Sequence, residues 1–249
     1  MVISTNHINI GLFYIISGLI GGSIGFGLSV ILRLELALPG YLINSSSQYN
    51  SIISFHGLVM IFFMIMPLLI GGFGNLLIPL MLCSSDMIFP RLNAISFWLV
   101  MESLLLIICS IIFDGGINCG WTFYIPLSLM NYSSIDLLFF SLHLVGLSSL
   151  LGSINFICTL FKASNISIIF FNLLFIPLYC WSIFFTSLLL IISLPVLAGC
   201  ITMVICERHI NTLFFDPLRG GDISLFLFPF LNCIFYFYYY LLLVPKYLI

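Results

Sequence analysis

The stretch that decides the fold is residues 55–81, FHGLVMIFFMIMPLLIGGFGNLLIPLM, which contains no Asp, Glu, Lys or Arg. An α-helix needs about 20 mainly apolar residues to cross the hydrocarbon core of a bilayer, and this run is longer. It therefore predicts a membrane-spanning helix. The whole chain has the same character, since 62% of its 249 residues are hydrophobic and only 6% are charged. This composition cannot cover a water-soluble surface and indicates an integral membrane protein.

Further apolar runs lie on both sides of this stretch and predict an all-α, polytopic transmembrane helix bundle. We expect Arg33, Glu35 and the Pro39-Gly40 pair to close the first helix. The bundle is expected to contain five helices, at about residues 8–32, 51–82, 92–113, 135–161 and 168–205.

Residues 223–249 form an apolar tail that can supply a sixth membrane segment, because they exceed the length of about 20 residues that a span requires. Pro229 lies inside the tail and predicts a kink. No charged or Ser/Pro-rich linker divides the preceding chain. We therefore expect one membrane domain over residues 1–222, followed by the tail.

The charged residues and the cysteines exclude other classes of protein. Six Lys and Arg against eight Asp and Glu give a net charge of −2, which is too few cations for a nucleic-acid interface. The eight cysteines are scattered, mostly through apolar runs, and no C-x-x-C occurs. We interpret them as small core residues and not as a metal cluster or a disulfide framework. Residues 1–6 lack the features of a cleaved signal or transit peptide.

The candidates for function are the few polar side chains within apolar helices, because such groups are costly in hydrocarbon. His56 is the leading candidate. Its imidazole can offer one ring nitrogen to a haem iron or another metal while a hydrogen bond holds the other nitrogen. It can equally be a hydrogen-bonded structural histidine, and its position alone leaves both interpretations open. His7, His143 and His209 are expected to have structural or interfacial roles.

A second group of polar residues gathers around the end of the second predicted helix. Hydroxyl and amide groups can hold a chain of water, and a carboxylate at its mouth can collect protons. Hydrogen bonding between helices, with the Asp as a cap, is the commoner use of such residues. Asp86 is about 45 Å along the chain from His56, which places the two on opposite membrane faces. The group comprises Asn75, Asp86, Asn93, Ser148, Ser149 and Asn155.

Several long runs occur in an order that resembles the N-terminal half of the large subunit of haem–copper cytochrome c oxidases, a 12-helix membrane fold. The runs are STNHINIG (4–11), FHGLVMIFFMIMPLLIGGFGNLLIPLM (55–81), DMIFPRLNAISFW (86–98), GWTFYIPL (120–127), SLHLVGLSSLLGSINFICT (141–159), SLPVLAGCITM (193–203) and NTLFFDP (211–217).

The resemblance implies roles for individual residues. His56 matches one axial ligand of the low-spin haem a, and Arg33 matches the residue that hydrogen-bonds its formyl group. Glu35 and Gly40 match positions of a peripheral calcium or sodium site. The family's proton channel would include Tyr14, Asn75, Asp86, Asn93, Ser148, Ser149 and Asn155.

The remaining metal ligands of the family have no counterpart here, because no histidine follows His209. The resemblance therefore implies a subunit divided between two polypeptides. The second fragment would hold the high-spin haem and the copper of the binuclear centre. The complete enzyme, respiratory complex IV, passes electrons from cytochrome c through a copper-bearing second subunit to dioxygen and pumps protons. Heavy use of Phe, Ile, Leu, Tyr and Asn favours the mitochondrial inner membrane.

Two other functions remain open at this point. The first is a membrane scaffold that has kept the helices but holds no haem. The second is a small transporter or channel whose path follows the Asn and Ser residues. Haem content would distinguish either of them from an oxidase subunit.

Overall fold

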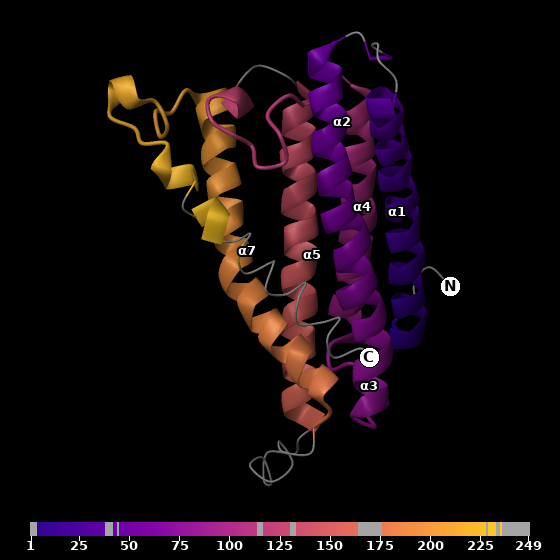
Figure 1. The fold of residues 1–249 in the computed structure, drawn as a ribbon. Helices are drawn as coiled ribbons and strands as arrows, with labels where there is room; N and C mark the ends of the chain where they lie inside the picture. Colours follow the sequence, from indigo (N-terminus) through magenta and orange to yellow (C-terminus); the bar gives the residue numbers. More distant parts are fainter. Residues whose placement is uncertain are drawn as a thin grey trace.

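The computed structural model describes residues 4–37, 42–43, 45–113, 117–129, 133–163, 176–227, 229–232 and 235. Within these residues, five helical spans are long and apolar enough to cross a membrane, and they lie side by side (Figure 1). The predicted all-α transmembrane bundle is confirmed. The spans are α1 (His7–Ala37), a composite second span (Ser46–Met81), α4 (Pro90–Ile112), α5 (Ser133–Ala163) and α7 (Leu178–Ile210).

Six of the ten helix ends lie within two residues of the expected ones, but α1 and α7 end five residues later and the second span begins five residues earlier. Arg33 and Glu35 lie within the last turns of α1 and not after its end, because a charged side chain does not by itself interrupt a helix. Pro39 and Gly40 lie outside the described residues. The last helix begins at Leu178, directly after Pro177, and residues 168–175 of its expected range are likewise outside the described part.

The second span changes its helical form along its length. It begins as α2 (Ser46–Leu58), capped by the Ser45 side chain, which accepts from the backbone N–H of Gln48. It continues as two π-helical segments, η1 (Val59–Ile65) and η2 (Pro67–Gly74), and ends as α3 (Asn75–Met81). Pro67 lacks a backbone N–H, so the regular hydrogen-bond ladder is interrupted at the start of η2. π-Helical turns of this kind often occur beside functional sites.

Glycine residues allow α1 to pack very closely against the second span. A Cβ atom on Gly21 would lie 2.5 Å from the carbonyl oxygen of Phe63, and one on Gly25 would lie 2.6 Å from Sδ of Met60. In the other direction, a Cβ atom on Gly71 would lie 2.4 Å from the ring of Tyr14. Close approach through small residues is a main source of helix association in lipid, where burial of apolar surface gains little.

An ion-pair cluster joins α5 to the end of α7. The Arg208 side chain is 3% exposed, and its Nε and Nη2 donate to the two carboxylate oxygens of Asp136 at 2.8 and 3.2 Å. Its Nη1 donates to the carbonyl of Ser128 in the short helix η3 (Leu127–Leu129) at 3.3 Å. Nε2 of His209 also lies 3.1 Å from Asp136. This bidentate pair fixes one end of the bundle.

The beginning of the tail belongs to the main apolar core. Phe226 is 1% exposed and stacks on Phe230 with ring centroids 5.3 Å apart. Phe230 packs edge-on against Phe123, and Phe226 packs in the same way against Phe215. The expected sixth membrane segment falls mostly on residues 236–249, which are outside the described part of the chain.

The close contact of α1 with the second span leads to a first prediction. Replacing Gly21 with Ala should destabilise the protein by about 1–3 kcal/mol, because the added methyl must push back the backbone at Phe63. Gly27→Ala in the same helix is the matched control, since a Cβ atom there meets nothing within 4 Å. Thermal unfolding of the two variants in detergent measures the difference. An equal loss of stability in both would contradict the assigned cause.

Candidate functional site

His56 lies on α2, where its ring is held by the neighbouring helix α1. Its Nδ1 lies 2.8 Å from the carbonyl oxygen of Gly25, so Nδ1 carries the proton and donates it. A Cβ atom on Gly25 would collide with the side chain of Met60, so the glycine lets α1 and the second span come this close. The Nε2 atom has no hydrogen-bond partner among the described residues. An imidazole fixed in this way presents the Nε2 lone pair for coordination, as metal-ligating histidines do.

His56 is half-buried, and Trp121 lies next to the adjacent residue Gly57. A Cβ atom on the adjacent Gly57 would lie 3.7 Å from the side chain of Trp121. Arg33, in the last turns of α1, is exposed and forms no hydrogen bond or ion pair with another described residue. Its guanidinium is therefore available to a group outside the described chain.

Glu35 anchors the connection that follows α1. Its Oε2 accepts from the backbone N–H groups of Leu42 and Ile43 at 3.0 and 2.9 Å. Gly40, the other residue of the expected calcium or sodium site, lies outside the described residues. Among the residues that the structure describes, no group of three or more His, Cys, Asp or Glu side chains could hold a metal ion. The metal site at Glu35 and Gly40 therefore stays a prediction.

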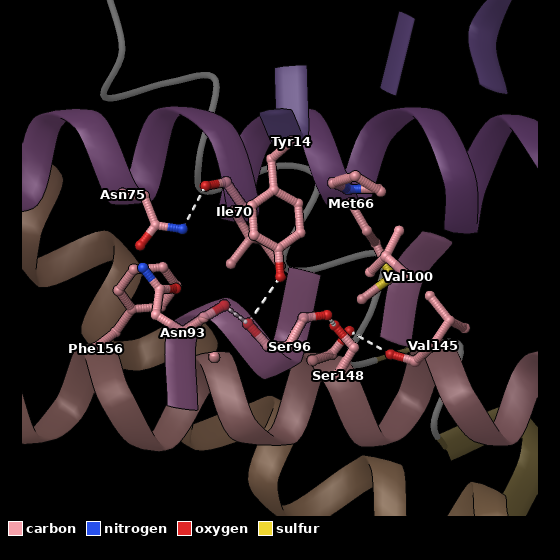
Figure 2. Close-up of a pocket in the computed structure, with 14 residues that line it drawn as sticks. Tyr14, Met66, Ile70, Asn75, Asn93, Ser96, Val100, Val145, Ser148 and Phe156 are labelled. Carbon is pink, nitrogen blue, oxygen red and sulfur yellow. Dashed lines mark hydrogen bonds between the residues drawn. The ribbon is translucent and has the colours of Figure 1, made fainter. Parts of the chain in front are cut away.

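A second candidate site is a cavity of about 30 Å³ between α1, the second span, α4 and α5 (Figure 2). A volume of 10–15 Å³ suffices for one water molecule, so the cavity has room for about two. Five of the seven residues expected on the proton path line it, and they come from four different spans. They are Tyr14, Asn75, Asn93, Ser148 and Ser149.

Ser96 is the centre of the hydrogen-bond network in this cavity. Its hydroxyl donates to the carbonyl of Asn93 at 2.7 Å, so the Tyr14 hydroxyl, at 2.8 Å, donates to the oxygen of Ser96. Ser148 donates to the backbone carbonyl of Ser96 at 2.6 Å and so joins α5 to α4. The sequence prediction did not include Ser96. Its position three residues after Asn93, on the same helix face, is the pattern that would have identified it.

Two buried amide atoms in the cavity lack protein partners. Asn75 donates through Nδ2 to the carbonyl of Gly71 at 2.7 Å, but its Oδ1 has no partner among the described residues. The Nδ2 of Asn93 is likewise buried without one. Buried polar atoms are nearly always hydrogen-bonded to protein or to water. One acceptor and one donor that face the same cavity therefore indicate bound water.

The remaining two predicted residues lie outside the cavity, near the loop after α3. Asp86 accepts from the backbone N–H of Met87 at 2.8 Å, and its Oδ1 lies 3.1 Å from Nδ1 of His7. The side chain of Asp86 is 37% exposed and that of His7 is 12% exposed. Pairing of His7 with Asp86 was not predicted, because the two residues are far apart in sequence. Because the Asp86 side chain is 37% exposed, water reaches its carboxylate at this end of the bundle.

Asn155 has a structural role in the same region. Its Oδ1 accepts from the backbone N–H of Phe89 at 3.1 Å, and its Nδ2 donates to the Phe89 carbonyl at 3.3 Å. Both hydrogen bonds tie the loop that carries Asp86 to α5. The Asn155 amide therefore forms structural hydrogen bonds to a neighbouring element, which was the alternative to lining a path for water.

Cys119 is a buried free cysteine, and it is chemically inert at neutral pH. Burial raises the pKa of its thiol to about 12. The group therefore stays protonated and can act neither as a nucleophile nor as a thiolate ligand. Cys119, Cys180 and Cys200 are buried, as expected for small core residues, but Cys83 is exposed and does not fit that interpretation.

The comparison with known proteins identifies the family. The model of cytochrome c and quinol oxidase polypeptide I matches residues 9–246. The chain belongs to this family. Cytochrome c oxidase subunit 1 of Yarrowia lipolytica is 48% identical over 228 residues, and that of Pecten maximus is 47% identical over 227 residues. Subunit 1 of Candida albicans is 40% identical over 251 residues.

The chain spans less than half the length of these cytochrome c oxidase relatives. The alignments cover 90% of this chain and 42% of the Yarrowia protein, 90% and 47% for the Pecten protein, and 97% and 46% for the Candida protein. The expected resemblance to an N-terminal portion of an oxidase large subunit is confirmed at the level of the family. The five membrane-spanning helices make this family member a multi-pass membrane protein.

The unpaired amide atoms lead to a second prediction. An experimental structure that resolves water should show ordered water within hydrogen-bond distance of both Asn75 Oδ1 and Asn93 Nδ2, because these atoms have no other described partner. The measurement is electron density in the cavity that Figure 2 shows. A dry cavity, or side-chain amides rotated to bond directly to each other, would contradict it.

Proposed function

We propose that this chain is the N-terminal half of the catalytic subunit of a mitochondrial cytochrome c oxidase in the inner membrane. Membership of the family supports the oxidase assignment. The observation that carries this chain's own role is the hydrogen bond from His56 Nδ1 to the Gly25 carbonyl, which leaves Nε2 suitably oriented for an iron. The function would be electron transfer from cytochrome c to dioxygen, coupled to proton pumping by the assembled complex.

His56 fits the role of one axial ligand of haem a. A neutral imidazole with its Nδ1 proton engaged is a good donor through Nε2. The haem, when bound, supplies one-electron redox chemistry. The Gly25 carbonyl, fixed by close packing of α1, prevents the imidazole from turning away. Arg33 lies at the end of α1 with its guanidinium uncommitted, which suits donation to the formyl oxygen of the same haem.

The other proposed role of this chain is to admit protons. Asp86 collects a proton from water at the surface, and the adjacent His7 holds its carboxylate in place. Water held by Asn75 and Asn93 would carry the proton into the cavity beside Tyr14, Ser96, Ser148 and Ser149. Asn155 supports this path indirectly, since it fixes the loop that carries Asp86.

The rest of the enzyme would come from other polypeptides. A second fragment of the same subunit would supply the other axial ligand of haem a, the high-spin haem and the copper of the binuclear centre. A copper-bearing second subunit would receive electrons from cytochrome c. This chain has no histidine after His209 and covers less than half the length of its relatives, so these parts would lie outside residues 1–249.

A third prediction tests the haem assignment. His56→Leu should abolish the low-spin haem absorption of the complex purified through this chain, because the iron loses one of its two axial ligands. His209→Gln is the control, since that side chain is 56% exposed at the C-terminal end of α7 and glutamine keeps a hydrogen-bond donor for Asp136. The reduced-minus-oxidised spectrum and the subunit inventory are the measurements. An unchanged spectrum in His56→Leu would refute the ligand role, and an active complex with no second histidine-bearing fragment would refute the divided subunit.

A fourth prediction separates proton uptake from capping at Asp86. Asp86→Asn keeps the acceptor for the Met87 N–H but removes the ionisable group, so oxygen consumption should fall by about tenfold or more while both haems remain bound. Asp222→Asn is a matched control, because Asp222 is an exposed carboxylate that also accepts from a nearby backbone N–H, that of Ser224. Normal turnover and pumping in Asp86→Asn would leave Asp86 as a cap.

A further inference from the structure

Helix α4 carries an outward-facing stripe that no described element covers. Its members are spaced alternately by four and three residues over the whole helix. Ile95, Trp98, Leu105 and Ile112 are 54%, 42%, 62% and 72% exposed, and Cys109 is partly exposed. The stripe comprises Arg91, Ile95, Trp98, Glu102, Leu105, Cys109 and Ile112.

Glu102 is the one acidic residue on this stripe, and it lies near the middle of the membrane. It comes 12 residues after Pro90 and 10 residues before Ile112, the two ends of α4. At a rise of 1.5 Å per residue, it is about 18 Å from one end and about 15 Å from the other. A glutamate side chain is too short to reach the water at either interface.

The other charged residues of the described spans are placed differently. Each lies within four residues of a helix end, where water or a lipid headgroup is near. These residues are Arg33, Glu35, Arg91, Asp136, Lys162, Glu207 and Arg208. Glu102 is therefore an exception among the charged residues of the described spans, and its position calls for a specific cause.

No described residue satisfies the carboxylate of Glu102. It is exposed, and it forms no hydrogen bond or ion pair with any other residue in the described part of the chain. Lipid tails have no hydrogen-bond donor to offer. The neighbouring stripe residues Trp98 and Leu105 are large and apolar, so they do not form a wet groove around it. A carboxylate in this setting needs a donor at the same depth.

We propose that Glu102 is the docking point for a transmembrane helix of a second polypeptide, which carries a basic side chain at mid-membrane depth. Charge complementarity determines the chemistry of the partner, because only a cationic donor fully compensates a carboxylate in hydrocarbon. The spacing of the stripe indicates that the partner is a helix. A stripe that alternates between three and four residues is the seam along which two helices pair, and one polar residue in such a seam fixes the register.

Crosslinking in the intact complex tests the partner. A photoreactive phenylalanine analogue, p-benzoylphenylalanine, is placed at Trp98 or at Leu105, on either side of Glu102. Both positions should crosslink to the same second polypeptide, within a transmembrane segment that contains Lys, Arg or His. The same analogue at Leu147, a 47% exposed residue on α5, is the control for general contact with lipid or protein. Adducts with lipid alone, with a second copy of this chain, or with the tail that contains Lys246 would each overturn the proposal.

Substitution of Glu102 tests the role of its charge. In Glu102→Leu the crosslink yield and the amount of the partner in the purified complex should both fall by at least about tenfold, as expected for loss of a mid-membrane ion pair. Glu102→Gln, which keeps the shape and an acceptor, should retain part of both. Partner content unchanged in Glu102→Leu would overturn the proposal. If Glu102→Leu fails to accumulate, the Gln variant decides, because undiminished crosslinking there would show that charge has no role.

Discussion

The close contact between α1 and the second span is the interaction on which both candidate sites depend. Gly21 allows the backbones to approach so closely that a single added carbon would meet the Phe63 carbonyl at 2.5 Å. Toward one end of this contact, the Gly25 carbonyl reaches the ring of His56. Toward the other, the ring of Tyr14 packs on Gly71 and places its hydroxyl in the cavity. A wider separation of the two helices would disrupt both arrangements.

The absence of water from the membrane core explains how the remaining polar groups are arranged. Many serine hydroxyls in the helices donate to carbonyls three or four residues earlier, as Ser96 does to Asn93 and Ser149 does to Val145. Such bonds satisfy a hydroxyl without a partner from another helix. In the side-chain amides of Asn75 and Asn93, one atom each finds no nearby backbone group to hydrogen-bond. These two residues line the cavity. The cavity is thus located where local hydrogen bonding fails.

The five spanning helices of the described residues could be predicted from the sequence, because long apolar runs have few alternatives in a membrane. Five of the seven residues expected on a proton path line one cavity, while their role in proton transfer stays a prediction. The ends of the helices were less predictable, since Arg33 and Glu35 are tolerated in the last turns of α1. The pairing of His7 with Asp86 and the central place of Ser96 depend on contacts between helices. No local pattern specifies those contacts.

Helix α1 links the two proposed activities through its length. Its first residue, His7, contacts Asp86, and Arg33 lies in its last turns. Arg33 comes 26 residues after His7, which corresponds to about 39 Å of helix, more than the hydrocarbon thickness of about 30 Å. The second span runs in the opposite direction, so His56 and Asp86 lie toward opposite ends of the bundle (Figure 1). Under the proposed function, one rigid helix pair would therefore hold the haem ligand toward one membrane face and the proton entrance at the other. That separation is what a vectorial reaction requires, because protons must enter from a single face.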